Sequence, residues 1–318
     1  MMNMKSSTFY YKDQDGIDIF VYKWEPDSSP IAAVQISHGM AEHAKRYEPV
    51  AEALTNEGFI VYADDHRGHG MTAGDLTEAT LEGNAGVLGP NGWEGTVNAI
   101  HELTKIIKKE NPDLPIFYLG HSWGSLLGQD YIQRWGNELK GCILSGTTGK
   151  SNKLLLKMGK LIAKKQLKKL GPTKPSETMD KLTFGAYNKP WNNEPDATGF
   201  EWLSRDKNEV KKYVDDPWCG FVCPASFYLE MLKGLEKIWK KENEMKIPKD
   251  LPIYIFAGTE DPVSRGTKDI MPLIKRYKSY GIKDITYKFY EGGRHEMFNE
   301  INKDEVIKDV IDWLKSHL

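Results

Sequence analysis

The segment Gly120-His121-Ser122-Trp123-Gly124 decides the fold of this chain. The apolar residues 115–119 directly before it predict a buried strand, and residues 125–132 directly after it predict a helix. Glycines on both sides of a serine at such a junction allow a turn that is too sharp for larger residues. The turn strains the serine backbone and lifts its hydroxyl above the sheet, beside the N-terminus of the helix. Ser122 is therefore the candidate nucleophile.

A serine nucleophile of this kind is followed along the chain first by an acid and then by a histidine base. Two histidines lie after Ser122. His317 stands at the end of a predicted terminal helix, where helices fray. His295 follows the predicted strand 285–290 on a Gly-Gly loop, at the carboxyl end of the strand where catalytic loops of open sheets gather. We therefore predict His295 as the base.

The acid is expected after the preceding strand, residues 252–257. Glu260 and Asp261 both qualify by position. We favour Asp261 because its side chain is short and because Pro262 holds its backbone in an extended conformation. Asp261 would accept a hydrogen bond from Nδ1 of His295 and stabilise the imidazolium. Glu260 remains the alternative acid.

Attack by Ser122 on a carbonyl carbon would create an oxyanion, which needs backbone N–H donors. The N–H of Trp123, directly after the nucleophile, is one candidate. The second is the N–H of Met40, in the loop that follows the predicted strand 32–36 and that His38 and Gly39 would position. His38, Gly39 and His121 are also predicted to lie at the substrate, although packing is the alternative for His121. The histidine spacings match no familiar ligand pattern, so we predict neither a metal nor another cofactor.

Composition excludes several function classes. The net charge of -2 at pH 7 gives no global basicity for nucleic acid. Three cysteines (Cys142, Cys219 and Cys223) argue against a disulfide framework and favour a reducing compartment. No apolar run has the length of a signal peptide or a membrane span. We therefore expect a cytoplasmic protein with a small-molecule ester or lipid substrate, and the oligomeric state stays open.

The order of elements predicts an α/β fold. Residues 8–11 and 17–24 form an expected opening hairpin, and strands then alternate with helices. Such alternation implies a mostly parallel sheet flanked by helices on both faces, here with eight strands. The remaining strands are predicted at 31–36, 59–63, 115–119, 141–145, 252–257 and 285–290, with helices around 46–57, 93–109, 125–132 and 304–316.

Residues 150–246 contain no clear strand and predict a helical cap, inserted after the sixth strand and above the active site. The α/β core would then comprise residues 1–149 and 247–318. Leu154, Met158 and Leu161 recur at helical spacing with lysines between them. Such a helix either docks on anionic lipid or packs one face and solvates the other. We favour packing, because the lysines are spread widely around the helix.

Several segments resemble the monoglyceride lipase and lysophospholipase branch of the α/β-hydrolases, the serine-aminopeptidase-like group. The resemblance rests on His38-Gly39-Met40-Ala41-Glu42-His43 with Arg46-Tyr47, on Asp64-Asp65-His66-Arg67-Gly68-His69-Gly70, on the serine turn, on Leu203-Ser204-Arg205-Asp206 with Tyr213 and Asp216-Pro217, on Gly258 with Asp261-Pro262-Val263, and on Gly292, Gly293, His295 and Glu296.

The resemblance implies an α/β-hydrolase fold and ester hydrolysis through an acyl-enzyme, with Ser122, Asp261 and His295 as the triad. Trp123 stands where members of the branch commonly carry Met, and its side chain would narrow the acyl side of the pocket. An alternative is an aminopeptidase of the proline iminopeptidase type, in which Glu194, Glu201 or Glu230 would grip an ammonium group. A second alternative is a non-catalytic ligand-binding protein on the same scaffold.

Overall fold

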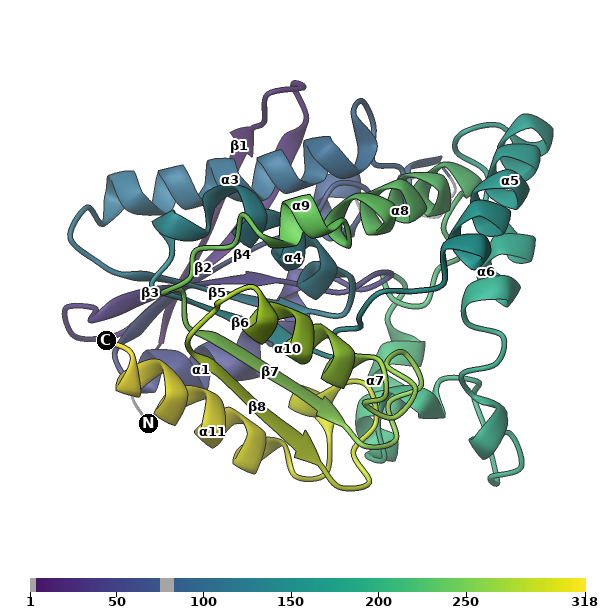
Figure 1. The fold of residues 1–318 in the computed structure, drawn as a ribbon. Helices are drawn as coiled ribbons and strands as arrows, with labels where there is room; N and C mark the ends of the chain where they lie inside the picture. The colour runs from purple at the N-terminus through teal and green to yellow at the C-terminus, as the bar shows by residue number, and fades with distance from the viewer. Residues whose placement is uncertain (1–3, 75–82) are drawn as a thin grey trace.

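The computed structural model describes residues 4–74 and 83–318, in which eight strands form one sheet (Figure 1). The strand order is β1-β2-β4-β3-β5-β6-β7-β8. Strands β3 to β8 run parallel, whereas β1 and β2 form an antiparallel hairpin that joins the sheet through β4. The strands are β1 (Lys5–Lys12), β2 (Asp18–Glu25), β3 (Ala32–Ser37), β4 (Phe59–Asp64), β5 (Ile116–His121), β6 (Gly141–Ser145), β7 (Ile253–Gly258) and β8 (Ile285–Tyr290).

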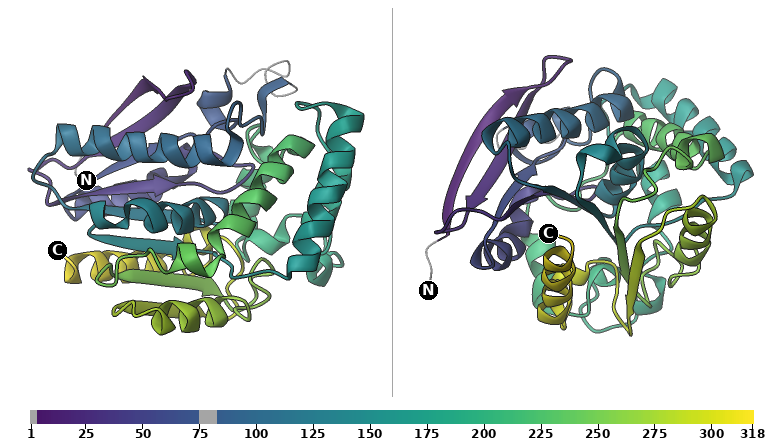
Figure 2. Two further views of the ribbon diagram at one scale, coloured as in Figure 1. Left: turned by 45° about the horizontal axis from the view of Figure 1, so that its top comes forward. Right: turned by 60° about the vertical axis from the view of Figure 1, so that its left-hand side comes forward.

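Helices cover both faces of the sheet (Figure 2). One apolar cluster joins three helices, α3, α4 and α10, to one face, and a second cluster joins α1 and α11 to the other. The central strands β3 to β7 are buried along their whole length because both faces are covered. These helices are α1 (Glu48–Asn56), α3 (Gly92–Glu110), α4 (Trp123–Trp135), α10 (Ile270–Ser279) and α11 (Lys303–Ser316).

The strand order locates the expected ligand site. β3 has β4 on one side and β5 on the other, so the chain connections diverge between β3 and β5. Ligands of open α/β sheets bind at such a switch point, outside the carboxyl ends of the strands. Here β3 ends at Ser37 and β5 ends at His121. The loop after Ser37 and the turn at Ser122 therefore meet at this point.

The insertion between β6 and β7 is helical, as predicted, and follows the sixth strand. Helix α8 packs against α3 and α4 as well as against α5, so it ties the insertion to the sheet. The exact limits of a separate cap, 150–246, remain a prediction. Its helices are α5 (Lys153–Leu170), α6 (Glu177–Thr183), α7 (Lys207–Asp215), α8 (Ala225–Ile238) and α9 (Lys241–Glu244), with short 3-10 turns at Lys189–Trp191 and Glu201–Leu203. In the described part of the chain, no helix combines the length and the apolar character that crossing a membrane requires.

Two helix starts differ from the prediction by two residues, and those of α3 and α11 by one. The expected helix 46–57 is a 3-10 turn, Ala44–Tyr47, followed by α1, which begins at Glu48. A proline in the first turn of a helix needs no N–H partner, so Pro49 favours a start at this point. Helix α4 begins at Trp123 instead of Ser125, directly after the turn. The other 3-10 turns are Gly70–Ala73, Gly136–Glu138 and Met297–Asn299.

Candidate active site

The turn between β5 and α4 has the strained geometry that the sequence predicts. Ser122 adopts φ 50° and ψ −117°, a left-handed conformation that costs a non-glycine residue about 1–3 kcal/mol. A Cβ on Gly124 would lie 2.2 Å from the carbonyl oxygen of Ser37, and one on Gly120 would lie 2.5 Å from that of Gly124. Only glycines therefore let the strand and the helix approach this closely. The turn leaves Ser122 partly exposed above the sheet.

Ser122, His295 and Asp261 lie in one hydrogen-bonded row. Nε2 of His295 is 2.8 Å from Oγ of Ser122, and Nδ1 of His295 is 3.0 Å from Oδ1 of Asp261. A carboxylate oxygen only accepts, so Nδ1 carries the proton and Nε2 is free to accept the hydroxyl proton of Ser122. The arrangement can deprotonate the serine and hold the resulting imidazolium.

The competing acid, Glu260, is not the carboxylate that bonds to the histidine. Glu260 is exposed, whereas Asp261 is fully buried at the end of β7. The backbone N–H of Val263 donates to Oδ1 of Asp261 over 2.8 Å, and it fixes the oxygen that faces His295. Asp269, further along the chain, directly precedes α10 and pairs with Arg265. The geometry thus favours Asp261 over both neighbours.

The environment of His295 favours its charged form. Burial lowers the pKa of His295, but the negative charge of Asp261 and its hydrogen bond outweigh this, so the pKa is raised above its ordinary 6.5. Burial has no such compensation at His121, the other ring against His295. There, burial and the nearby His295 charge lower the pKa to about 3. His121 therefore stays neutral while His295 takes up and releases the proton.

The loop after β3 lies against the nucleophile. A Cβ on Gly39 would lie 3.2 Å from Cβ of Ser122, so glycine is needed for this approach. Within the described residues, neither the N–H of Met40 nor that of Trp123 donates a hydrogen bond to the protein. Two unpaired N–H groups beside a nucleophile are what an oxyanion requires. The roles of Met40 and Trp123 as donors stay a prediction that this geometry supports.

His38 sets the direction of the Met40 N–H. Nε2 of His38 accepts from the backbone N–H of His66 over 3.0 Å, so Nδ1 carries the proton and donates to the carbonyl of Gly39 over 2.7 Å. Burial lowers the pKa of His38 well below 6.5, which keeps this neutral tautomer. In a trans peptide the carbonyl and the next N–H point in opposite directions. Holding the Gly39 carbonyl therefore aims the N–H of Met40.

The structure places His38 and His121, two of the residues predicted to contact the substrate, in different surroundings. Both ring nitrogens of His38 are used by the backbone, so His38 supports the loop and has no ring nitrogen left for a ligand. His121 is buried, and its Nδ1 is 3.2 Å from Oγ of Ser145. It also lines a cavity of about 10 Å³, together with Arg46, Tyr47, Glu296, Phe298 and Asn299. That volume is about one water molecule, so His121 lies beside the site mainly as packing.

A buried ionic cluster behind the loop has no assigned role in the sequence analysis, although its residues belong to the recognised motifs. Arg46 donates to both carboxylate oxygens of Glu296, over 2.8 and 2.7 Å, and also pairs with Glu42. Glu42 accepts the N–H of Gly39 over 2.5 Å and the hydroxyl of Tyr47 over 2.9 Å. Burial alone would raise the pKa of Glu296, but the Arg46 guanidinium lowers it to about 2. The cluster holds Gly39 and the residue after His295 together.

The side chain of Trp123 packs among other aromatic rings next to the serine turn. The ring of Trp123 is buried, with its centroid 4.9 Å from that of Phe227 and 5.2 Å from that of His69. It occupies space beside the nucleophile, as expected for a residue that narrows the acyl side. Burial also lowers the pKa of His69 to about 3. His69 therefore stays neutral, and its Nε2 can accept the N–H of Ala41 over 3.2 Å.

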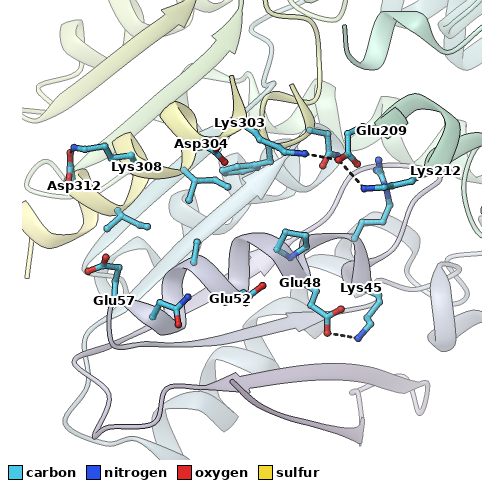
Figure 3. A pocket seen from close by; sticks show the side chains of 18 of the residues that line it. Lys45, Glu48, Glu52, Glu57, Glu209, Lys212, Lys303, Asp304, Lys308 and Asp312 are labelled. Carbon is cyan, nitrogen blue, oxygen red and sulfur yellow. Dashed lines mark hydrogen bonds and ion pairs between the residues drawn. The ribbon is translucent and has the colours of Figure 1, made fainter. Parts of the chain in front are cut away.

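A cluster of side chains around His43 and a charged groove lie apart from the triad. His43, Asp216 and Cys219 have potential metal-ligating atoms within 4.8 Å of one another, but His43 and Asp216 already bond to each other over 2.8 Å. A groove of about 770 Å³ lies between α1, α7 and α11 (Figure 3). Lysines and carboxylates line it, several of them paired, as in Lys45–Glu48. The triad residues are not among its lining residues.

The chain is similar to known proteins along its whole length. The sequence profile of the family described as serine aminopeptidase, S33, matches residues 28–302. A monoacylglycerol lipase of Mycolicibacterium smegmatis is 29% identical over 327 aligned residues, which cover 100% of both chains. The human monoglyceride lipase is 26% identical over 94% of this chain and 88% of its own. A thermostable carboxyl esterase from Bacillus coagulans, solved with glycerol, has a TM-score of 0.87 at 27% identity and covers 99% of each chain. The expected fold class is confirmed.

Proposed function

The chain belongs to the serine aminopeptidase, S33, family and is a serine ester hydrolase; we propose that its substrates are monoacylglycerols or lysophospholipids. The observation that carries the proposal is the row of hydrogen bonds from Ser122 through His295 to Asp261. The names of the relatives point to the same chemistry, since two are lipases of monoacylglycerols and one is a carboxyl esterase.

The proposed reaction runs through an acyl-enzyme. His295 takes the proton of Ser122 as Oγ bonds to the ester carbon, and the N–H groups of Met40 and Trp123 hold the oxyanion. The imidazolium then gives its proton to the leaving alcohol, and the ester C–O bond breaks. Water, deprotonated by the same imidazole, adds to the acyl carbon, and Oγ of Ser122 leaves with the proton. The enzyme returns to its starting state with one alcohol and one acid released.

A screen of esters against amides tests the substrate class. Monoacylglycerols and p-nitrophenyl esters of varied chain length are expected to give kcat/KM values at least about a hundredfold above those of a proline amide, because the site offers no unengaged carboxylate for an ammonium group. Activity on lysophospholipids would fit the same proposal. A proline amide that is turned over faster than every ester would contradict it.

The aminopeptidase alternative lacks its binding group. Glu201 accepts from Thr198, Gly199 and Asn188. Although burial acts to raise its pKa, these hydrogen bonds lower the pKa to about 2. Glu194 faces Arg294 over 3.3 Å, and Glu230 pairs with Lys233 over 2.6 Å. All three carboxylates named for an ammonium group are thus engaged within the protein.

Helix α5 supports a transient contact of the cap with a lipid surface. Four of its apolar side chains are at least half exposed: Leu154 (62%), Leu155 (62%), Met158 (50%) and Leu161 (59%). Lysines surround them and would favour anionic lipid. Leu156 and Ala163 occupy the packed face of the helix and leave these residues outside, so packing of one face and contact of the other with lipid are compatible. A cytoplasmic location stays a prediction.

Sedimentation with anionic phospholipid vesicles tests this contact. The double variant Leu154→Asp/Leu161→Asp is expected to bind at least about tenfold less protein, because each leucine side chain contributes roughly 1.5–3 kcal/mol on full burial. Ile31→Asp, which alters an exposed apolar residue at the other end of the sheet, is the matched control. Equal binding by all three proteins would show that α5 only packs within the cap.

A further inference from the structure

The cap touches the loop that carries the catalytic base. The carbonyl of Trp202 accepts the backbone N–H of His295 over 3.3 Å, and that of Leu203 accepts the N–H of Glu296 over 2.7 Å. The Arg294 guanidinium donates to the carbonyls of Glu201 and Ser204 over 2.8 and 3.1 Å. Residues 201–204 therefore run beside residues 294–296 and are bonded to each of them.

The side chain of Trp202 reaches the base itself. Its ring centroid lies 5.1 Å from that of His295, with 33° between the planes, and the indole is 8% exposed. On another side of His295 lies the neutral ring of His121, at 4.8 Å. An indole face attracts a cation more strongly than it attracts a neutral ring. Trp202 therefore favours the imidazolium that forms when Ser122 gives up its proton.

The same part of the cap also touches the oxyanion loop. The hydroxyl of Tyr213 and the backbone N–H of Gly220 both donate to the carbonyl of Ala41, each over 2.9 Å. Ala41 follows the predicted donor Met40 and adopts φ 54°, a left-handed conformation that alanine avoids. Its own N–H donates to His69. The strained residue is thus held by the sheet domain on one side and by the cap on the other.

We propose that residues 201–220, here named the cap clamp, are a working part of the catalytic site and not a detachable cover. One end of the cap clamp positions His295, and the other end positions the N–H of Met40. Trp202 and Tyr213 are its positioning residues. This inference rests on the proposed function, because it takes His295 as base and Met40 as oxyanion donor.

Trp202 and the carboxylates near His295 contribute to the stability of the imidazolium in different ways. Asp261, Glu296 and Glu42 all favour the imidazolium electrostatically. His121, the other titratable ring in contact, stays neutral. Asp261 is the only one of these carboxylates that bonds the His295 ring in the described structure. Trp202 contacts the ring itself, with the two ring centroids 5.1 Å apart, whereas Glu296 and Glu42 make no hydrogen bond to this ring in the described structure.

Tyr213→Phe tests the end of the cap clamp at the oxyanion loop. The variant keeps the ring and loses the bond to Ala41, so kcat is expected to fall roughly tenfold with KM within twofold, a part of the loss seen when an oxyanion donor is removed. The affinity of a trifluoromethyl ketone, whose adduct places an oxyanion in the same position, should fall by the same factor. Tyr228→Phe loses a hydrogen bond to Asp180 inside the cap and should change neither quantity.

Trp202→Leu and Trp202→Phe test the other end. Leucine removes the π face, and kcat/KM is expected to fall about 2- to 30-fold. The acid limb of the pH profile should move to lower pH, because the imidazolium loses a stabilising contact. In Trp202→Phe, which keeps a π face, kcat/KM and the position of the acid limb should both stay close to those of the wild type. Equal losses for leucine and phenylalanine, or an unmoved acid limb, would overturn the role of Trp202.

The outcomes separate this inference from the proposed function. If Ser122→Ala is inactive while Tyr213→Phe and Trp202→Leu both retain the wild-type kcat, the triad stands and the cap clamp is refuted. A loss that appears in KM alone would also refute it, because a clamp on reacting groups acts on the chemical step. If Ser122→Ala remains fully active, the proposed function itself is wrong.

Discussion

Replacing Ser122 by alanine is expected to lower kcat for ester hydrolysis by about 10⁵- to 10⁶-fold. The reason is geometric, since Oγ of Ser122 is the one hydroxyl within 2.8 Å of Nε2 of His295 among the bonds of the described structure. The fold should remain, because alanine meets no new contact at this position and keeps the backbone that the flanking glycines allow. The measurement is steady-state hydrolysis of a monoacylglycerol, beside thermal unfolding of the same preparation.

Two controls make the result specific to Ser122. Ser279→Ala removes an exposed hydroxyl that bonds to its own helix, and this variant should retain wild-type turnover. A fluorophosphonate should label the wild-type protein once per chain and leave Ser122→Ala unlabelled, since only an activated serine reacts. Labelling of Ser122→Ala, or near-normal ester turnover by it, would exclude Ser122 as nucleophile. Failure of the wild-type protein to react would favour the ligand-binding alternative.

Local patterns carried most of the fold prediction. Strands 141–145 and 285–290 agree with β6 and β8 at both ends. Their alternation with helices was sufficient to predict the parallel sheet, because parallel neighbours need a crossover. The start of α4 could not be predicted from composition. Ser122 caps the helix through its unusual backbone angles, and these depend on how closely β5 and α4 pack.

The three residues of the predicted triad, which the structure brings into one hydrogen-bonded row, could be selected because each follows a strand in a known order. Choosing Asp261 over Glu260 needed a local argument about side-chain length and Pro262, and in the structure Asp261 is buried and bonds to His295, whereas Glu260 is exposed. The ionic cluster was not predictable in the same way. Arg46 and Glu296 are separated by 250 positions, and nothing in either local pattern says that they meet.

The cap clamp illustrates the same limit. No sequence pattern singles out Trp202, and Tyr213 enters only through the family resemblance. Their partners, His295 and Ala41, are reached through backbone carbonyls and N–H groups, which every residue has. Sequence reasoning finds side chains with distinctive chemistry. It does not find contacts that any residue could make, and such contacts position both reacting loops here.

Asp261→Asn, compared with Glu260→Gln, tests the acid assignment. Asparagine keeps the shape of Asp261 and removes its charge, so the imidazolium loses its main stabilising partner. The value of kcat is expected to fall about 10³- to 10⁴-fold. Glu260 is exposed, so Glu260→Gln should stay within about threefold of the wild type, the range of an ordinary surface change. Steady-state kinetics on one ester decides between the two residues.

The pH dependence of kcat/KM in the same two variants tests the acid assignment independently, through the direction in which the acid limb moves. His295 must be neutral to act as base, so kcat/KM rises with pH through the pKa of His295. Asp261 holds that pKa above 6.5 against the effect of burial, and in Asp261→Asn burial acts without this opposition. The acid limb of the variant is therefore expected at lower pH than in the wild type, and that of Glu260→Gln is expected to be unchanged. An acid limb that moves in Glu260→Gln and stays in place in Asp261→Asn would reverse the assignment, since the carboxylate that bonds the imidazole is expected to raise its pKa the most.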